Sequence, residues 1–528
     1  MTDYSKQPGT VYLVGAGPGH PGLITRWGYE LLQHCDAVAY DALIPMELIA
    51  GLPPGVERYY VGKRAGRHSL PQSQINELLV KLARRGLTVV RLKGGDPFIY
   101  GRSGEEAEFL RSAGLRVVMI PGVTSASAAA ALSGFSLTNR QSSSWVFLAT
   151  GHAAEGTITP VPWDMVGALP GGTIVVYMGL AKLDNVVGEL LSSGLDPKMP
   201  AIAVQAASTG LQRCVEAPIE NISAECKKQK LKPPALVIIG GAVEYRSKEV
   251  AQLQRPLAGK TVLVTGSSRI MQRLCVLLRD AGAEPLPYPT RASAITDDAE
   301  GWNRFAKLVD QGGVLLFQRE EEVEYFLKGL LAHNLDLRSL HRFKVLASGH
   351  SVESALLKSG IKADAVLQPS SSDTVAAAIS GLIQGVSQSV VVVRNSYGKS
   401  HLEESLHARF SGIIPLTVCA SSTAVWEPHW QDELAADPPD LILFAEAAEV
   451  ESFVEILGKD TAGKLAERSV VAAMDKSVIA TLSKNGLTSH FEADAVNADA
   501  FVEALIRHAQ KKPAVGRINF PASLGVSK

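Results

Sequence analysis

Short runs of Val, Ile and Leu alternate along the chain with segments that have helical spacing or turn residues. In the first half these runs are TVYLVGAG (10–17), DAVAYDAL (36–43), TVVRLKGG (88–95), RVVMIPGV (116–123), SWVFLATG (144–151), GTIVVYMG (172–179), PAIAVQAA (200–207) and PALVIIGG (234–241). Apolar runs of this length, bounded by glycine or other turn residues, are typical of strands buried on both faces of a parallel sheet. The pattern therefore predicts an α/β fold.

A polar stretch, EYRSKEVAQLQRP (244–256), interrupts the alternation, and we place the main domain boundary there. The alternation resumes with GKTVLVTGSSRI (259–270), VLLFQ (314–318), KVLAS (344–348), SVVVVRN (389–395), LILFAE (441–446) and SVVAAM (469–474). Within this second module, LLFQREEEVEYFLKGL (315–330) and LILFAEAAEVESFVEIL (441–457) share a strand, a turn and a helix start. This weak repeat predicts two similar lobes.

Length and charge narrow the class of protein. A chain of 528 residues exceeds one hydrophobic core and suggests about three or four domains. Lysine and arginine number 52 against 53 acids, so the net charge of -1 gives no general field that would attract nucleic acid. The N-terminal MTDYSKQPGT lacks the order of a signal peptide, and the apolar runs are too short to span a bilayer. We expect a cytoplasmic protein without a membrane segment.

Metal chemistry has no support in the sequence. The five cysteines contain no CxxC pair, and the twelve histidines form no HExxH motif or cluster of ligand spacing. Reduced, mostly buried thiols are the expected state of these cysteines. We therefore predict no metal site.

Two glycine loops, GAGPGH (15–20) and KGGDP (93–97), follow predicted strands, where open α/β sheets bind ligands. The first resembles a dinucleotide fingerprint, with Asp36 about twenty residues on. However, His20 replaces the third glycine, and Pro18 and Pro21 remove N–H donors that a pyrophosphate would use. A nucleoside without phosphate, such as S-adenosylmethionine, fits better, with Asp96 able to hold ribose hydroxyls. Simple turn chemistry is the alternative interpretation of KGGDP.

Over about residues 10 to 245, the first module contains the blocks VGAGPGHPGLIT, VAYDALI, VGKRAGRHSLPQSQIN, VRLKGGDPFIYGRSGEE, PGVTSASAAAALSGFSLTNR, ATGH and VVYMGL. In these blocks it resembles the uroporphyrinogen-III C-methyltransferases of the tetrapyrrole methylase superfamily. This family transfers two methyl groups from S-adenosyl-L-methionine to uroporphyrinogen III, giving precorrin-2 for siroheme or cobalamin. The resemblance implies the same double C-methylation here, and a homodimer formed through the methyltransferase half.

The resemblance also implies roles for individual residues. Cofactor contacts fall on Pro18, Gly94, Gly95, Asp96, Ile99, Thr124, Ser125, Met178 and Ala207. The proton acceptor falls on Asp41 and the proton donor on Lys63, although Lys63 could instead only attract the substrate's carboxylates. Arg64, Arg102 and Arg140, and also Arg67, lie beside matched blocks and are expected to pair with those carboxylates. One departure is His20, where the family usually has aspartate, and we expect altered affinity or pH response.

The second module, about residues 257 to 510, resembles uroporphyrinogen-III synthase, which cyclises hydroxymethylbilane. The blocks are KTVLVTGSSRI, LLFQREEEVEYF, VLASGHSVESALLKSGIKADAVLQPSSSDTVAAAI, VVVVRNSYGKSHLEESL and LILFAEAAEVESFVEIL. The family's polar positions are poorly kept, because its Thr-Ser pairs, an arginine and a tyrosine are replaced by Gln318-Arg319, Ala445-Glu446, Gly266 and Cys419. Two hypotheses stay open for this half: a working cyclising enzyme, or a retained tetrapyrrole-binding module.

The expected architecture is a two-lobed α/β methylase domain followed by a two-lobed, flavodoxin-like synthase domain. The predicted ranges are 10–245 for the methylase (lobes 10–122 and 123–245), 246–256 for a linker, 257–510 for the synthase (lobe one 257–289 plus 417–510, lobe two 290–416) and 511–528 for a tail. The predicted function is bifunctional: S-adenosylmethionine-dependent methylation of uroporphyrinogen III and cyclisation of hydroxymethylbilane. A nicotinamide-dependent oxidoreductase is a remote alternative.

Overall fold

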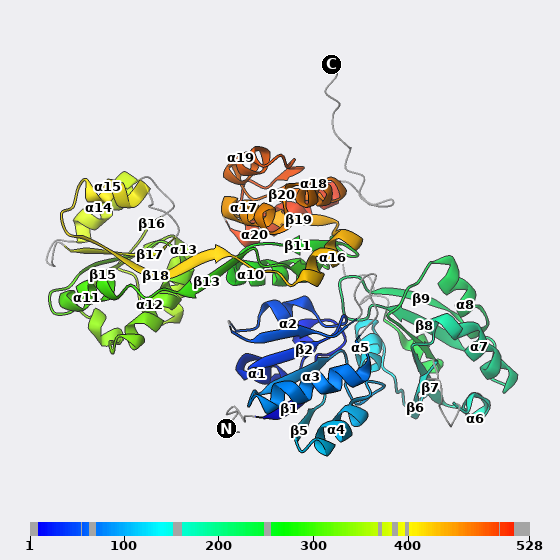
Figure 1. Ribbon diagram of the computed structural model, residues 1–528. Coiled ribbons are helices and arrows are strands. Elements are labelled where there is room, and N and C mark those ends of the chain that lie inside the picture. The colour runs from blue at the N-terminus through cyan, green and yellow to red at the C-terminus, as the bar shows by residue number, and fades with distance from the viewer. Residues whose placement is uncertain are drawn as a thin grey trace. The chain divides into compact units, whose positions relative to one another are not determined.

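The computed structural model is α/β throughout, with four sheets that are mostly parallel (Figure 1). It describes residues 9–53, 55–62, 70–151, 161–247, 255–367, 372–382, 389–396, 401–495 and 497–511. Contacts divide the chain into two compact units, one made of residues up to 290 together with 425 onwards, the other of Arg291–Ala424. The α/β fold class predicted from the sequence is confirmed, while the exact domain limits stay a prediction.

The first sheet has the order β3-β2-β4-β1-β5, and all its strand pairs are parallel. Its strands are β1 (Thr10–Gly15), β2 (Ala37–Tyr40), β3 (Glu57–Tyr60), β4 (Val89–Lys93) and β5 (Arg116–Ile120). Its helices are η1 (Pro21–Leu23), α1 (Arg26–His34), α2 (Met46–Ala50), α3 (Gln72–Arg84) and α4 (Ser103–Ser112). Both faces are covered, because alternate residues of β1 pack in different cores: Leu13 with residues of α3 and α4, Val14 with residues of α1 and α2.

The second sheet has the order β6-β7-β10-β8-β9, in which β10 runs antiparallel to both its neighbours. Its strands are β6 (Trp145–Thr150), β7 (Gly172–Tyr177), β8 (Pro200–Gln205), β9 (Arg213–Pro218) and β10 (Ala235–Ile239). Its helices are α5 (Ser125–Leu132), α6 (Trp163–Ala168), η2 (Leu180–Lys182), α7 (Leu183–Ser192), α8 (Ile219–Lys228) and η3 (Gly241–Tyr245). Because β10 is antiparallel to both β7 and β8, these two strands run in the same direction. β6 is parallel to β7, so β6, β7 and β8 all end at the same edge of the sheet.

The third sheet also belongs to the first unit and has the parallel order β12-β11-β19-β20-β21. Its strands are β11 (Thr261–Val264), β12 (Glu284–Pro287), β19 (Leu441–Phe444), β20 (Val470–Ala473) and β21 (Phe491–Glu492). Its helices are α10 (Ser268–Asp280), α16 (Pro428–Ala436), α17 (Ala447–Leu457), α18 (Lys459–Arg468), α19 (Lys476–Lys484) and α20 (Ala498–Lys511). The segment EPLP forms the edge strand β12, where the missing N–H groups of proline do not interrupt a ladder.

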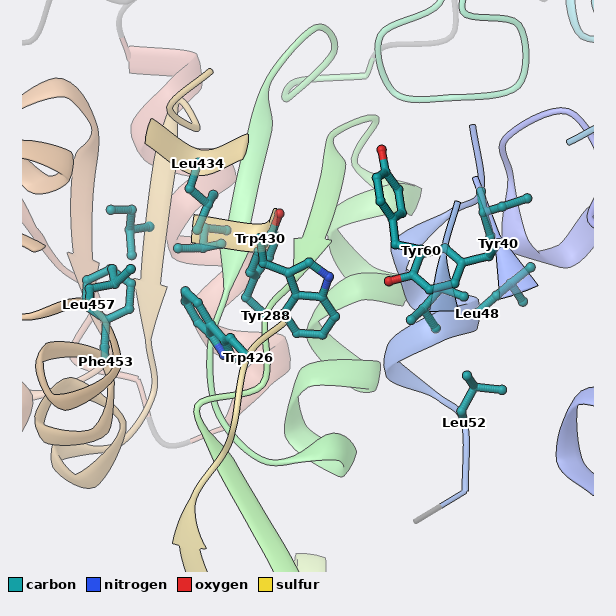
Figure 2. Packing of buried hydrophobic residues seen from close by; sticks show 14 of the residues in the cluster. Tyr40, Leu48, Leu52, Tyr60, Tyr288, Trp426, Trp430, Leu434, Phe453 and Leu457 are labelled. Atoms are coloured by element: carbon teal, nitrogen blue, oxygen red, sulfur yellow. The ribbon is translucent and has the colours of Figure 1, made fainter. Parts of the chain in front are cut away.

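Aromatic side chains join the first and third sheets inside the first unit, as Figure 2 shows. The ring of Tyr60 stacks on His429 with a centroid distance of 4.0 Å, and the Tyr40 hydroxyl donates to Glu427 Oε1 at 3.0 Å. In the same cluster, Tyr288 meets the ring of Trp430 edge-on, with ring centroids 5.3 Å apart. The two sheets therefore share one hydrophobic core.

The second unit contains one sheet, of order β13-β18-β17-β14-β15-β16. Its strands are β13 (Arg291–Ile295), β14 (Gly313–Phe317), β15 (Phe343–Ser348), β16 (Ala365–Leu367), β17 (Val390–Asn395) and β18 (Ile413–Thr423). Its helices are α11 (Ala299–Leu308), α12 (Glu320–Ala332), η4 (Leu337–Leu340), α13 (His350–Lys358), α14 (Ser372–Leu382) and α15 (His401–His407). Only the edge strand β13 is antiparallel to its neighbour, so this lobe too is dominated by parallel pairing.

Candidate functional site

The two glycine loops predicted from the sequence meet at one edge of the first sheet. Because the sheet is parallel, β1, β2, β4 and β5 all end there. The loop after β1 pairs with the loop after β4, since Gly95 N–H donates to Gly17 O at 2.7 Å and Gly17 N–H donates to Gly95 O at 3.2 Å. This pairing of loops beyond the strand ends lies where α/β sheets bind ligands.

Three glycines at this edge pack backbone against backbone. A Cβ atom added to Gly15 would lie 2.6 Å from Gly122 Cα, and one added to Gly122 would lie 2.2 Å from Gly95 O. Gly95 also has a φ of +67°, which favours glycine. We call Gly15, Gly95 and Gly122 the glycine cradle: no Cβ fits at Gly15 or Gly122, and at Gly95 the positive φ favours glycine.

Acidic residues flank the cradle on two sides. Asp96 directly follows Gly95, and its Oδ1 accepts the Phe98 N–H at 3.0 Å, which fixes the turn after the glycines. Asp41 follows β2, the strand next to β4, and its side chain is 28 % exposed. The loop after Asp41 reaches the glycines, since a Cβ on Gly94 would lie 3.2 Å from Leu43 Cβ. Asp41, Gly94 and Asp96 are thus brought together.

The second sheet presents its own strand ends to the loop that carries Thr124 and Ser125. Thr124 Oγ1 lies 2.6 Å from the hydroxyl of Tyr177, the last residue of β7. Met178 comes next, with a φ of +50° and a side chain that is 55 % exposed. From the other loop, the Tyr100 hydroxyl donates to Leu148 O of β6 at 2.7 Å. Ile99, beside it, packs against the same core as Tyr177.

The loop after β8 contacts the first glycine loop. Ala207 is buried between two residues with positive φ, Ala206 and Ser208. The His20 N–H donates to Ser208 Oγ at 3.1 Å, and a Cβ on Gly19 would lie 2.5 Å from Thr209 Cγ2. Pro18, which is half-buried, belongs to the same contact region. The strand ends of both sheets therefore meet around one set of loops.

His20 caps η1, a role that an aspartate could also fill. Its Nδ1 accepts the Gly22 N–H at 2.9 Å. Burial, and then the charge of Arg279, lower the pKa of His20, so its ring favours the neutral form that can accept this bond. The departure from the family pattern therefore keeps the cap but loses the negative charge.

Of the predicted substrate-binding arginines, Arg102 and Arg140 lie within the residues that the structure describes. Arg140 precedes β6, so a whole strand, roughly 17 Å at about 3.3 Å per residue, separates it from the ends of β6 and β7. Arg102 is exposed and its guanidinium pairs with Glu105 Oε2 at 2.6 Å. Lys63, Arg64 and Arg67 lie outside the described residues. Their roles stay predictions.

Sequence reasoning missed a buried ionic cluster directly behind Asp41. It consists of Arg91 and Lys93 on β4, Glu106 on α4, and Asp41 itself. Tyr177, whose hydroxyl contacts Thr124 and accepts the Ala126 N–H at 3.3 Å, was also missed. A signal was present, because two cations interrupt the otherwise apolar run VVRLK in a strand predicted to be buried.

The cradle suits a ligand approached through bare main chain, such as a nucleoside. In the part of the chain that the structure describes, no three His, Cys, Asp or Glu residues form a group that could hold a metal ion. Nor does any helix in the described ranges have the length and apolarity to cross a membrane.

In the third and fourth sheets, a buried glutamate fills the corresponding strand ends. Glu322 Oε2 accepts the N–H groups of Gln318 at 2.8 Å and Arg319 at 2.9 Å. Glu449 Oε2 accepts the Ala445 N–H at 2.8 Å and the hydroxyl of Thr265 at 3.0 Å. Burial raises the pKa of each carboxyl to about 7. The repeat seen in the sequence thus places one glutamate in the first turn of α12 and one in that of α17.

Comparison with known proteins gives two family matches. Residues 10–223 match the family model for Tetrapyrrole (Corrin/Porphyrin) Methylases, and residues 272–503 match that for Uroporphyrinogen-III synthase HemD. The uroporphyrinogen-III C-methyltransferase of Bacillus subtilis (strain 168) is 34 % identical over 365 residues, which are 69 % of this chain and 74 % of that protein.

Two further relatives match different extents of the chain. The porphyrin biosynthesis protein HemD of Ruminiclostridium josui is 34 % identical over 356 residues, 67 % of this chain and 70 % of that protein. The chloroplastic S-adenosyl-L-methionine-dependent uroporphyrinogen III methyltransferase of Arabidopsis thaliana is 44 % identical over 237 residues, 45 % of this chain and 64 % of that protein.

These matches, with the glycine cradle at the end of a parallel sheet, define the class: the chain belongs to the tetrapyrrole methylase family. More particularly, it joins such a methylase to a uroporphyrinogen-III synthase domain. Both resemblances seen in the sequence are thereby confirmed.

Proposed function

We propose that this chain is a bifunctional enzyme of tetrapyrrole biosynthesis. Its N-terminal half methylates uroporphyrinogen III twice, with S-adenosyl-L-methionine as the methyl donor, and forms precorrin-2. Its C-terminal half cyclises hydroxymethylbilane to uroporphyrinogen III and so supplies the substrate of the first half. The observation that carries the methylase proposal is the glycine cradle, where added Cβ atoms on Gly15 and Gly122 would meet main chain at 2.2 to 2.8 Å.

The residues around the cradle suit this donor. Backbone groups of Gly94 and Gly95 would contact it, and the Asp96 carboxylate would accept hydrogen bonds from its ribose. Thr124, Ser125, Met178 and Ala207 come from the loops that meet the cradle, and Pro18 and Ile99 add apolar contact. The donor, when bound, supplies an activated methyl group whose transfer leaves positive charge on the substrate ring.

Asp41 is the proposed base. Once a ring carbon has been alkylated, the ring must lose a proton, and a carboxylate at the edge of the same site can accept it. Partial exposure leaves Asp41 accessible to a bound substrate. Lys63 as proton donor, and Arg64, Arg102 and Arg140 as partners of the substrate's carboxylates, remain part of the proposal. A homodimer through the methylase half and a cytoplasmic location stay predictions.

A coupled assay tests both activities at once. We expect the purified chain, given hydroxymethylbilane and S-adenosylmethionine, to form precorrin-2 without added synthase. If only supplied uroporphyrinogen III is methylated, the C-terminal half is a binding module and its synthase role is wrong. If neither substrate is methylated and calorimetry detects no binding of S-adenosylhomocysteine, the methylase proposal is wrong as well.

The cofactor assignment has its own test. Asp96→Ala should weaken binding of S-adenosylhomocysteine by about tenfold or more, because the variant loses a charge-assisted hydrogen bond. Asp164→Ala, on α6, is the control, since Asp164 belongs to none of the loops that meet the cradle. Unchanged donor affinity in Asp96→Ala would contradict the assignment.

A further inference from the structure

Four charged side chains, including the proposed base Asp41, form a continuous cluster. Lys93 Nζ donates to Glu106 Oε2 at 2.9 Å, and Arg91 Nε lies 3.5 Å from Glu106 Oε1. Arg91 Nη2 then donates to Asp41 Oδ2 at 3.3 Å. The cluster thus runs from the first turn of α4, across β4, to the end of β2.

Most of this cluster is out of contact with water. The side chain of Glu106 is 0 % exposed, that of Arg91 5 % and that of Lys93 8 %. Burial lowers the pKa of Lys93, against the opposing attraction of Glu106. Moving such ions out of water costs several kcal/mol each, and apolar residues of similar size often stabilise a fold at least as well. Packing alone therefore gives no reason for two cations in a buried strand.

Arg91 is held by hydrogen bonds from Nη1, while its Nε makes no hydrogen bond within the described residues and lies at ion-pair distance from Glu106. Its Nη1 donates to Leu92 O at 3.1 Å and to Ala39 O at 3.4 Å, while Glu106 faces its Nε. A planar guanidinium fixed in this way presents Nη2 in a single direction. Glu106 is fixed in turn, because it also accepts from Gln72 Nε2 of α3 at 2.9 Å.

The direction of Nη2 sets the orientation of the Asp41 carboxylate. Asp41 Oδ2 faces Arg91, and Oδ1 lies 3.4 Å from the N–H of Leu43, the residue that packs on Gly94. Both oxygens therefore have protein partners, the buried guanidinium of Arg91 for Oδ2 and the exposed N–H of Leu43 for Oδ1. A carboxylate held at two atoms loses little freedom when it accepts a proton from a substrate.

We propose that Arg91 and Glu106 are positioning residues for the proton transfer in which Asp41 takes part. This proposal rests on the proposed methylase function. Arg91 holds the Asp41 carboxylate towards the cradle, and Glu106 holds Arg91 and balances its charge. Neither residue contacts the donor or the substrate ring, so both act on turnover and not on binding.

The test compares three variants of the full chain: Glu106→Gln, Arg91→Lys and Asp41→Asn. Glu106→Gln and Arg91→Lys should lower kcat for methylation by about tenfold or more, in line with the usual share of proton transfer in catalysis. The KM for uroporphyrinogen III and the calorimetric Kd for S-adenosylhomocysteine should change by less than about threefold, because binding groups are untouched. Arg91→Lys keeps the positive charge, so a lower kcat in this variant would result from changed geometry and not from a lost charge.

A double-mutant cycle separates positioning from general damage. Adding Arg91→Lys to Asp41→Asn should lower kcat no further, because Arg91 acts only through the carboxylate already removed. Arg85→Lys is the control: this exposed arginine of the same lobe pairs with Glu57, outside the cluster, and should leave kcat unchanged. Where Glu106→Gln fails to fold, the Arg91→Lys cycle alone decides the question.

The outcomes distinguish this proposal from the function beneath it. The positioning role alone is wrong in two cases, both with an active wild type and an impaired Asp41→Asn. In the first, Arg91→Lys has normal kcat. In the second, Arg91→Lys lowers kcat further when it is added to Asp41→Asn. If Asp41→Asn is fully active, Asp41 is not the base, and the positioning role of Arg91 and Glu106 is wrong as well. If wild type neither binds the donor nor methylates, the proposed function and this inference both fail.

Discussion

The methylase half and the synthase half treat the ends of their parallel strands in opposite ways. At the first sheet, the main chain of Gly15, Gly95 and Gly122 meets without side chains. Helix α5, which begins there, is not capped by the Thr124 hydroxyl, which pairs with that of Tyr177; the Tyr177 hydroxyl in turn accepts the Ala126 N–H at 3.3 Å. In the synthase half, buried carboxylates accept the strand-end N–H groups.

This difference bears on where a ligand can interact with the backbone. At the cradle, the N–H and carbonyl of Gly95 pair with Gly17, and the Ala126 N–H of α5 donates to the Tyr177 hydroxyl. A glutamate that accepts two N–H groups, as Glu322 does, has used the donors of that turn. The methylase strand ends therefore pair with neighbouring loops, whereas the synthase strand ends pair with buried carboxylates, which a substrate that uses the same N–H groups must displace.

Adding one methyl group to the cradle should have the largest effect. In Gly122→Ala the new Cβ would lie 2.2 Å from Gly95 O, so the main chain must move apart. We expect binding of S-adenosylhomocysteine to weaken by roughly 100-fold, and the free energy of unfolding to fall by about 1–3 kcal/mol, as for overpacked cores. Calorimetry and urea denaturation measure the two effects.

Gly104→Ala is the matched control for this change. Gly104 lies in α4 of the same lobe, nothing is within 4 Å of its added Cβ, and alanine is the better helix former. Its donor affinity should equal that of wild type. Equal affinity in Gly122→Ala would mean that the cradle is only a packing feature, and the contrast between the two halves would lose its functional meaning.

The second prediction removes the buried carboxylate that accepts an N–H group at a strand end of the third sheet. Glu449→Ala leaves the Ala445 N–H without its buried acceptor, while the Thr265 hydroxyl keeps Leu443 O as an acceptor at 2.7 Å. We expect the free energy of unfolding to fall by about 1–3 kcal/mol, the usual cost of an unsatisfied buried group. Glu451→Ala, an exposed position of the same helix, should change it by less than about 0.5 kcal/mol. Similar values for both variants would show that the buried acceptor is not needed.

Sequence patterns predicted the sheets better than the contacts between them. Each apolar run taken as a strand forms one, because burial on both faces requires apolar residues along its length. Strands such as β3 (ERYY) and β9 (RCVEAP) were missed, since each lies at a sheet edge, is only partly buried and carries charges. These two edge strands lack the continuous apolar run that made the edge strands β5 and β6 predictable.

Prediction of the candidate site from the sequence is limited in the same way. The glycine loops were located from the sequence, because glycine before a turn is a local signal. The pairing of Arg91 with Asp41 depends on β2 lying next to β4, which is a property of the sheet order. The distance of Arg140 from the strand ends likewise follows from the direction of β6. Both facts need the tertiary structure.

The third prediction concerns the protonation of the filled ends. Burial raises the pKa of Glu322 and Glu449 from 4.5 to about 7. A raised carboxyl pKa gives stability that is complete below pH 4.5 and is lost as pH rises through about 7. The free energy of unfolding of Glu449→Gln should therefore fall less steeply than that of wild type between pH 5 and 8, by up to about 1.4 kcal/mol per pH unit.

Urea denaturation at several pH values measures this slope, with Glu451→Gln as the control because that acid is exposed. The methylase half should contribute no such slope at its cradle, whose contacts are made by glycine backbone. If Glu449→Gln and wild type have the same pH dependence, the carboxylate of Glu449 is ionised in the folded protein and the filled strand end is an ordinary charged helix cap.

The smallest effect is expected at His20, where a titratable ring caps a methylase loop. Its ring must be neutral to accept the Gly22 N–H, and its lowered pKa means that this stability is present above pH 6.5 and is lost as pH falls. His20→Asp can keep the cap to about pH 4 and should gain up to about 1 kcal/mol over wild type between pH 8 and 5.5. Urea denaturation at both pH values measures the gain, and His34→Gln, a change at an exposed position of α1, should show none. If the free energy of unfolding has the same pH dependence in His20→Asp and wild type, the His20 ring does not cap η1.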